Sequence, residues 1–227
     1  MKKDDSRANI WVYNQLREQI ETLVLKPGTE LNLTELSESL GVSRSPLRDA
    51  LLRLERDSLV DIFPQKGTRV SYLDISDIRQ ERFMRMNLEL GALKSFMDLE
   101  LNDLAKEAYV TRLKSLLLKQ KAALISGSYI DFLKADDEMH ATFYSQLGYE
   151  RVYAVLFSHT GNERRIRLLS SLAGNIANDI ETQHEAIIDA IARGAKEEAL
   201  ELDRDHLNKI EDEYPMLIEL FPQYFLK

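Results

Sequence analysis

The residues with the most evident chemistry in this sequence are its four histidines, His140, His159, His184 and His206, which all lie in the second half of the chain. Neutral imidazole is a common ligand for transition metals, and the side chain changes charge close to neutral pH. Asp136 precedes His140 by four residues, a spacing that places a carboxylate and an imidazole on the same face of a helix. Three imidazoles and one carboxylate would hold a divalent transition ion and leave coordination positions open for a ligand.

The surroundings of His184 and His206 in the sequence are apolar, as a buried site requires. Isoleucines flank His184 at helical spacing, and Leu202, Leu207 and Ile210 lie near His206. Histidines on the apolar faces of separate helices converge inside a helical bundle, and bundles build metal sites in this way. A single histidine in such a position is more often a hydrogen-bonded core or surface residue than a ligand, so both interpretations stay open on residue types alone.

A second kind of chemistry is indicated by the segment LGVSRSPLRDAL, which has the features of a DNA-reading helix. Gly41 permits a tight turn, and Ser43 can cap the helix that follows. Arg44, Ser45 and Arg48 then occupy its first turns, where a recognition helix meets base edges and phosphates in the major groove. The alternative is a plain solvated helix with two surface arginines, which the agreement of several local signals disfavours.

The elements around this segment predict a winged helix-turn-helix. The expected order is a helix over residues 9–25, a second helix capped by Asn32 or Thr34, a third helix from Ser43, and strands over 59–63 and 68–72. Residues 64–67 join the strands as a hairpin turn. Lys66 and Gly67 at its tip are placed to reach the DNA backbone or minor groove.

From residue 76 onward the sequence predicts only helices, so the expected fold class is mainly α, a winged helix-turn-helix followed by an all-helical bundle. The expected helices cover residues 76–98, 102–126, 129–146, 150–173, 176–193 and 195–213. Pro215 and Pro222 predict a loosely ordered tail, and residues 73–76 a linker. We expect a DNA-binding domain over residues 1–73 and an effector-binding and dimerisation domain over 74–227.

Charge and composition fit a cytoplasmic protein of which only the N-terminal part meets nucleic acid. The chain of 227 residues has a formal net charge of -8 and no cysteine, which excludes disulfides and thiolate ligands. Residues 1–72 contain 11 lysines and arginines and 11 aspartates and glutamates, so the acidic excess lies beyond them. No run of ~18 apolar residues predicts a membrane span, and no apolar segment near the N-terminus predicts a signal peptide.

The N-terminal motifs resemble those of the GntR family of bacterial regulators. The matching stretches are Ile20-x-x-Leu23-x-Leu25-x-Pro27-Gly28, then Leu40 to Leu54, then Pro64-x-x-Gly67-x-x-Val70. The resemblance implies operator contacts at Arg44, Ser45, Arg48, Lys66 and Gly67. Two positions depart from the family pattern. Ser58 stands where glycine is usual, which predicts a less left-handed turn, and Thr34 occupies a position that is often basic.

The helical region is similar to the FCD domain of the FadR subfamily. The matching residues are Arg85, Leu88, Glu89, Asp136, His140, the run His184 to Ile187, His206 and Leu207. In metal-binding members the aspartate and the three histidines hold the ion. The resemblance therefore implies Asp136, His140, His184 and His206 as ligands of a divalent Zn, Ni, Mn or Fe ion. Asp137 is a competing ligand on the same helix face, and His159 matches no ligand position.

The arginines of this region leave alternatives open. Arg85 offers a planar fork to the carboxylate of an effector, which is the role we expect because family members tend to bind organic acids. It could equally form a salt bridge with Glu89 one turn on. Arg164, Arg165 and Arg167 are expected to form a charged helix face, from which one side chain could enter the pocket.

Together these patterns predict a ligand-responsive transcription regulator that binds a palindromic operator in double-stranded DNA as a homodimer. Its effector would be a small organic acid held with the help of a metal ion. Two alternatives remain: the same regulator with a metal-free pocket, or a helical metal-dependent hydrolase. The hydrolase needs a general base beside the metal, and Glu185 is the one obvious candidate. Glu185 directly follows a proposed ligand, and consecutive residues of a helix point in different directions, so we expect no enzyme.

Overall fold

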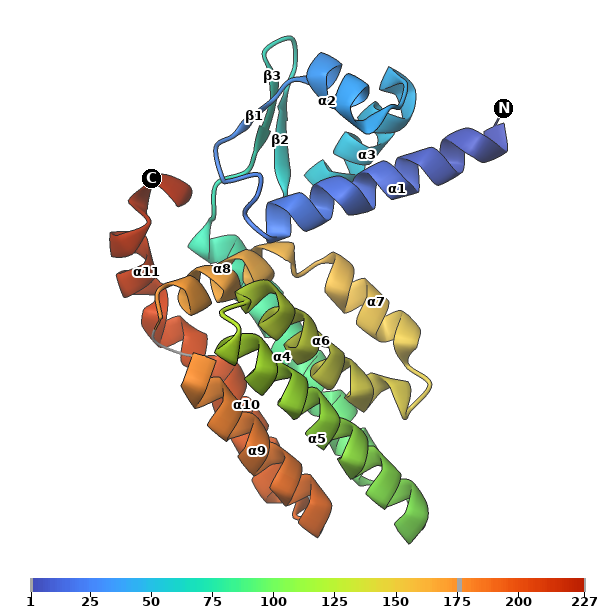
Figure 1. Ribbon diagram of the computed structural model, residues 1–227, viewed down its shortest axis with the longest axis vertical. Coiled ribbons are helices and arrows are strands. Elements are labelled where there is room, and N and C mark those ends of the chain that lie inside the picture. Colours follow the sequence, from blue (N-terminus) through green and yellow to red (C-terminus); the bar gives the residue numbers. More distant parts are fainter. Residues whose placement is uncertain (1, 175–176, 227) are drawn as a thin grey trace.

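The structure is a computed structural model that describes residues 2–174 and 177–226, with side chains from residue 7 on except those of 177 and 178. Figure 1 shows a small N-terminal unit of helices and strands at one end of a larger set of helices. The N-terminal elements are α1 (Lys2–Glu21), β1 (Glu30–Leu31), α2 (Leu33–Leu40), α3 (Arg44–Arg56), β2 (Val60–Phe63) and β3 (Gly67–Val70). The predicted winged helix-turn-helix is therefore confirmed.

Capping residues set the turn between α2 and α3. The Asn32 side chain accepts hydrogen bonds from the backbone N–H of Thr34 at 2.9 Å and of Glu35 at 3.4 Å, so Asn32 is the cap of α2. Gly41 ends α2 in the left-handed conformation, with φ 63°. Ser43 stands at the cap position of α3, although its side chain makes no capping hydrogen bond.

The three strands form one antiparallel sheet in the order β1-β3-β2. The sequence did not predict β1, because two residues are too few for an alternating pattern. The sheet and α1 to α3 share a buried core, whose members include Val12, Leu16, Ile20, Leu47, Leu51, Leu54 and Leu59. This core holds the inner face of α3 and leaves its outer face free.

Ser58, which follows α3, adopts a left-handed conformation with φ 57°, so the expectation of a less left-handed turn was wrong. The reason lies in the end of the helix. The backbone N–H of Ser58 donates to Glu55 at 3.0 Å and that of Leu59 to Leu54 at 2.9 Å. These bonds satisfy the last helical carbonyls and require a left-handed residue after the helix, whatever its side chain.

The remaining helices are α4 (Ile75–Met97), α5 (Asp103–Ile125), α6 (Tyr129–Ser145), α7 (Glu150–Ser158), α8 (Gly161–Leu172), α9 (Ala177–Arg193), α10 (Lys196–Asn208) and α11 (Tyr214–Leu220). Short 3₁₀ helices cover Lys209–Glu213 and Pro222–Tyr224. Helices α4, α5, α6, α9 and α10 lie beside one another and enclose an apolar core (Figure 1). The predicted helix start at residue 176 lies outside the described residues. No described helix is long and apolar enough to cross a membrane.

The single helix predicted over 150–173 is wrong, because the chain breaks between α7 and α8. His159 has φ -111° and ψ 13°, and Thr160 has φ -123° and ψ 35°, both outside the helical region. The break leaves the carbonyls of Phe157 and Ser158 without helical partners, and both accept hydrogen bonds from Arg17 of α1. A partner far away in the sequence therefore stabilises this break.

The predicted loose tail is also wrong. Pro215 stands in the first turn of α11, where a missing N–H is harmless. Beyond α11 the chain returns to the segment that precedes α4. The N–H of Leu73 donates to Tyr224 at 2.8 Å, and that of Leu226 donates to Leu73 at 2.9 Å. Leu73 and Phe225 are both buried. The segment predicted to be a linker is therefore hydrogen-bonded to the C-terminal segment.

Candidate metal centre and nucleic-acid interface

The four predicted metal ligands converge inside the helical part. Asp136 and His140 lie on α6, His184 on α9 and His206 on α10, and one ligand atom from each lies within 4.8 Å of the others. The Nε2 of His184 is 3.2 Å from the Nε2 of His206 and 3.4 Å from a carboxylate oxygen of Asp136. The Nε2 of His140 is 3.8 Å from the other oxygen of Asp136. This donor set suits a divalent transition ion.

The outer nitrogen of each histidine has an oxygen partner that holds the ring in place. The Nδ1 of His184 is 2.7 Å from the amide oxygen of Gln120, and the Nδ1 of His206 is 2.9 Å from that of Gln183. The Nδ1 of His140 contacts a carboxylate oxygen of Glu89. Because these oxygens only accept, each Nδ1 donates, and the neutral rings of His184 and His206 point an Nε2 lone pair inward.

The inward nitrogens then lack donors. Two Nε2 lone pairs, on His184 and His206, face each other at 3.2 Å, and the buried Nε2 of His140 has no hydrogen-bond partner among the described residues. Lone pairs that face one another repel unless a proton or a cation lies between them. The residues present therefore fit a metal ion.

Electrostatics keep two of the rings in the form that binds metal. Burial, followed by the nearby charges of His140 and Arg85, holds the pKa of His184 well below its usual range. Burial and the neighbouring His184 do the same to the pKa of His206. Burial alone would also lower the pKa of His140, but the carboxylates of Glu89 and Asp136 outweigh it and raise that pKa.

Asp136, and not the competing Asp137, belongs to the histidine cluster. Asp137 forms ion pairs with Arg164 at 3.0 Å and Arg167 at 2.8 Å. Burial would raise the pKa of Asp137, but these two guanidinium groups lower it strongly. Asp136 gives one oxygen to Arg167 at 3.2 Å and turns the other toward His184.

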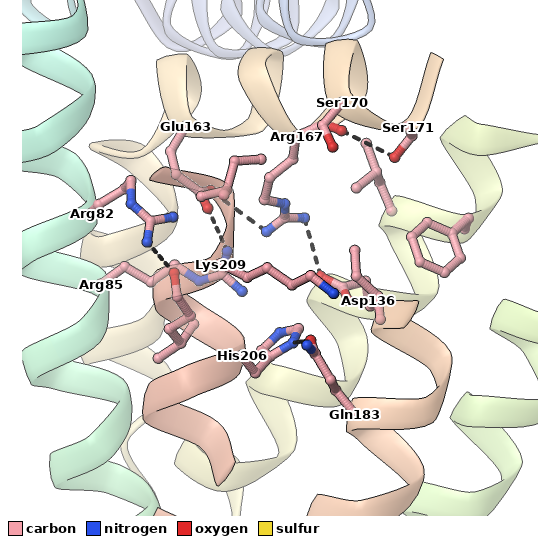
Figure 2. Close-up of a pocket in the computed structure, with 15 residues that line it drawn as sticks. Arg82, Arg85, Asp136, Glu163, Arg167, Ser170, Ser171, Gln183, His206 and Lys209 are labelled. Carbon is pink, nitrogen blue, oxygen red and sulfur yellow. Dashed lines mark hydrogen bonds and ion pairs between the residues drawn. The ribbon is translucent and has the colours of Figure 1, made fainter. Parts of the chain in front are cut away.

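A cavity of about 40 Å³ adjoins this cluster and is lined by many charged side chains. Figure 2 shows Arg82, Arg85, Asp136, Glu163, Arg167, Ser170, Ser171, Gln183, His206 and Lys209 around it. Arg85 lines the cavity and pairs with Glu163 at 2.5 Å and Glu89 at 3.3 Å, so the predicted salt bridge is present and the effector role stays a prediction.

Several charged residues of this region were not predicted, or were predicted wrongly. Arg164, Arg165 and Arg167 do not form a solvated face, because α8 is buried along most of its length and Arg165 is fully enclosed. Arg82 and Lys209 were missed as lining residues. The spacing of Arg82 and Arg85, three positions apart on α4, is the one signal that could have indicated Arg82.

The predicted DNA-contacting residues lie on the surface of the N-terminal unit. Arg44, Ser45, Arg48, Lys66 and Gly67 are all exposed, whereas the opposite face of α3 is buried. The only side-chain hydrogen bond given for either arginine within the described part of the chain joins Arg44 to the Thr34 hydroxyl at 3.3 Å. The start of α3 is therefore free to enter a groove.

Three charged side chains and two backbone carbonyls, which we call the junction cluster, join α1 to the helical part. Arg17 is buried and donates to the carbonyls of Phe157 at 2.7 Å and Ser158 at 2.9 Å. It also pairs with Glu21 at 2.6 Å, and Glu21 accepts from Arg164 of α8 at 3.2 Å. The junction cluster (Arg17, Glu21, Phe157, Ser158 and Arg164) connects the DNA-binding unit with the helix that lines the cavity.

His159 and Glu185, two other residues considered from the sequence, take no part in the metal cluster. His159 is exposed at the end of α7. Glu185 is exposed on α9 and pairs with Lys121 at 3.4 Å. A general base beside the metal is therefore not supplied by Glu185.

Comparisons with known proteins cover almost the whole chain. Residues 11–70 match the family described as bacterial regulatory proteins, gntR family, and residues 82–209 match the FCD domain. An HTH-type transcriptional regulator from an unstable DNA locus of Streptomyces ambofaciens is 30% identical over 94% of this chain and 88% of its own length. The HTH-type transcriptional regulator YdhC of Bacillus subtilis is 27% identical over 86% of each chain.

Solved structures show the same fold. The McbR/YncC structure from E. coli covers 94% of this chain and 98% of its own with a TM-score of 0.75 and 20% identity. A transcriptional regulator structure from Rhodococcus sp. RHA1 covers the same shares, with a TM-score of 0.72 and 24% identity.

Proposed function

Because this chain belongs to the GntR family of bacterial regulatory proteins and carries an FCD domain, it is a DNA-binding transcription regulator, and we propose that a metal-assisted organic acid controls it. We further propose that it acts as a homodimer on a palindromic operator. In this proposal residues 1–73 bind DNA, and residues 74–227 bind the effector and dimerise.

The observation that carries the metal proposal is the shared orientation of three histidines. Gln120, Gln183 and Glu89 accept from the outer nitrogens, so the inner nitrogens converge on Asp136. A divalent Zn, Ni, Mn or Fe ion bound there would supply an electrophilic anchor for a carboxylate or hydroxyl oxygen of the effector. The protein fixes the ligand geometry and excludes water around it.

Arg85 is the residue we expect to meet the acid group of the effector. It lines the cavity, and its guanidinium is held by Glu89 and Glu163 so that it cannot swing away. Arg82 and Lys209 add positive charge to the same walls. The cavity attracts an anion and repels a cation of similar size.

The small cavity also supports a mechanism of control. A volume of about 40 Å³ holds little more than a few water molecules, so an effector requires a wall to move. Helix α8 supplies part of that wall through Glu163, Arg167 and Ser170. The same helix carries Arg164, which pairs with Glu21 of α1. An effector that shifts α8 therefore changes the position of the DNA-binding unit, and operator affinity changes by the difference in binding free energy.

DNA recognition in this proposal uses Arg44, Ser45 and Arg48 at the start of α3, with Lys66 and Gly67 on the wing. One recognition helix reads only a few base pairs, and two related by a twofold axis give a palindromic site of useful affinity. The exposed positions of these residues support the assignment.

The test of the metal site measures metal content by elemental analysis in untagged protein purified without chelator. We expect loss of an ion in the His184→Ala variant and no loss in the His159→Ala variant, because His159 lies outside the cluster. Unchanged metal content in His184→Ala, or no metal in the native chain and no thermal stabilisation by Zn, Ni or Mn, would support a metal-free pocket instead.

The test of DNA recognition is a mobility-shift titration with the region upstream of the gene. Arg48→Ala should lose specific binding by about 10-fold or more. Arg56→Ala is the matched control, because Arg56 is also exposed on α3 but lies in its last turn. Equal loss in both variants would contradict readout by the start of α3.

A further inference from the structure

A second group of potential metal ligands lies on the far edge of the His140 ring. Ligand atoms of Glu89, His140 and Asp203 lie within 4.8 Å of one another, and all three residues are buried. Asp203 stands one turn before His206 on α10 and fully inside the protein. Asp203 is not a ligand of the proposed first metal site.

The side chain of Asp203 is buried without a hydrogen-bond partner among the described residues, and this holds for both of its carboxylate oxygens. A buried carboxylate is strongly disfavoured unless donors or a cation compensate it, and native interiors rarely contain one without them. The buried hydroxyl of Tyr144 is also without a partner in the described part of the chain.

The two carboxylate oxygens of Glu89 contact different residues. Its Oε2 pairs with the Nε of Arg85 at 3.3 Å, and its Oε1 contacts the Nδ1 of His140. Arg85 therefore neutralises Glu89 in part, while neither oxygen of Asp203 has a hydrogen-bond partner among the described residues. Ligand atoms of Glu89, Asp203 and His140, one from each, lie within 4.8 Å of one another, and Glu89 Oε1 is the oxygen that contacts the Nδ1 of the ring.

The His140 ring separates the two groups. Its Nε2 faces Asp136 and the other histidines, whereas its Nδ1 faces Glu89. We propose that Glu89, Asp203 and the Nδ1 of His140 hold a second divalent cation, so that the ring of His140 bridges two metal ions. Binding at Nδ1 releases its proton to solvent, and the ring becomes an imidazolate with one ion on each nitrogen.

The donor set defines the class of ion. Two carboxylates and one nitrogen favour Mn²⁺, Zn²⁺ or Fe²⁺ over soft ions, which prefer sulfur. The second site shares with the proposed first site the ring of His140 and Glu89, whose contact with Nδ1 the second ion would replace, whereas Asp203 contributes nothing to the first. The two sites can therefore fail separately.

The experiment measures the stoichiometry of metal binding. Metal-free, untagged, full-length protein is titrated with Mn²⁺ or Zn²⁺, and bound metal is counted after removal of excess. We expect two ions per native chain and one in Asp203→Asn, which keeps the size of the side chain but removes its charge. Asp205→Asn is the control and should bind two, because Asp205 is exposed on the same helix.

Variants distinguish failure of the two sites. His184→Ala should retain one ion, held by Glu89, Asp203 and His140. A native chain that saturates at one ion overturns the pair of sites, and the second site is the one that fails if Asp203→Asn retains that ion; an Asp203→Asn variant that still binds two also overturns the second site. A His184→Ala variant that still binds two overturns the first. The native measurement decides the question even where a variant does not fold, which circular dichroism shows.

Cobalt gives an independent readout of the bridge. Two Co²⁺ ions joined by one imidazolate couple magnetically, so the electron paramagnetic resonance signal of the doubly loaded native chain should be weaker than that of two isolated ions. Asp203→Asn should give the uncoupled signal of one ion. Two uncoupled ions in the native chain would contradict the bridging role of His140.

Discussion

Two glutamine side chains decide how the histidines of the cluster can act. Gln120 is fully buried, and its amide oxygen accepts from His184, while Gln183 does the same for His206. Acceptors at this position fix the tautomer and raise the basicity of the inner nitrogen. No sequence pattern indicated Gln120, because a glutamine on α5 has no spacing relation to a histidine 64 positions away.

We expect Gln120→Ala to weaken metal binding by about 10- to 100-fold, because His184 loses the acceptor that orients it. Competition with a metal-sensitive dye measures the affinity. Gln120→Glu keeps an acceptor and should recover part of the loss. Gln146→Ala, at an exposed glutamine, is the control. Equal affinities of the native chain and Gln120→Ala would show that the amide does not orient the ring.

Glu81 makes stability depend on pH. Burial raises its pKa from 4.5 to about 7, although the backbone of Glu163, the side chain of Asn162 and the charge of Arg165 act in the opposite direction; the charge of Glu163 adds to the increase. The folded chain then binds a proton more tightly than the unfolded chain. The stabilisation is complete below pH 4.5 and is lost as pH rises through about 7.

Replacement of Glu81 by glutamine should remove this dependence. The native chain and Glu81→Gln differ in their free energy of unfolding, and this difference is the quantity to follow with pH. It should shift against the native chain by about 1–3 kcal/mol between pH 5 and pH 8. Urea denaturation at several pH values measures it. A difference that stays flat or rises with pH would mean that Glu81 is ionised throughout.

At the scale of elements, Ser58 shows how helix ends override residue preference. The turn after α3 is left-handed because the backbone hydrogen bonds of Ser58 and Leu59 require it. A residue other than glycine is strained there by about 1–2 kcal/mol.

Ser58→Gly should therefore raise the free energy of unfolding by about 1 kcal/mol, because glycine adopts this conformation without a steric penalty. Glu55→Gly, inside α3, should lower it by about 1 kcal/mol, since glycine is a poor helix former. Chemical denaturation measures both. Destabilisation by Ser58→Gly would contradict the assigned strain.

The sequence predicted elements that are specified locally and missed those that depend on distant partners. Caps such as Asn32 and Gly41 and the periodicity of α4, α5 and α6 predicted those helices closely. The break at Thr160 was missed because Arg17, far away in the chain, binds the freed carbonyls. The packed tail was missed for the same reason, since Leu73 holds it.

The candidate site follows the same rule. Residue type and helical spacing left its four candidate ligands open between a metal role and a core role, and the resemblance to the FCD domain implied the metal role; the four residues converge. Asp203 and the outer partners Gln120 and Gln183 were not predicted, because their roles come from packing between helices.

At the scale of the whole molecule, we expect the junction cluster to make the two parts unfold together. Arg17 is the central residue of this cluster, and it is buried. Its guanidinium pairs with Glu21 of α1 and with Asp57 at the end of α3. It also donates to two carbonyls of α7. Removal of one member of a buried ion network leaves the other charges uncompensated.

We expect Arg17→Ala to lower the free energy of unfolding by about 3 kcal/mol or more. The single tryptophan, Trp11 on α1, reports the N-terminal unit, and far-ultraviolet circular dichroism reports all helices. The two probes should coincide in the native chain, whereas in Arg17→Ala the Trp11 transition should come first. Arg56→Ala is the exposed control. Coincident transitions in Arg17→Ala would show that other contacts join the parts.

The small cavity beside the histidine cluster has a kinetic consequence for the proposed effector. If a ligand that needs more than about 40 Å³ binds after a wall moves, its observed association rate should level off at high ligand concentration. The same wall motion would slow dissociation. A bound acid should therefore stay in place during many encounters between the regulator and its operator. We expect such a regulator to respond to a sustained supply of the proposed ligand and not to short pulses.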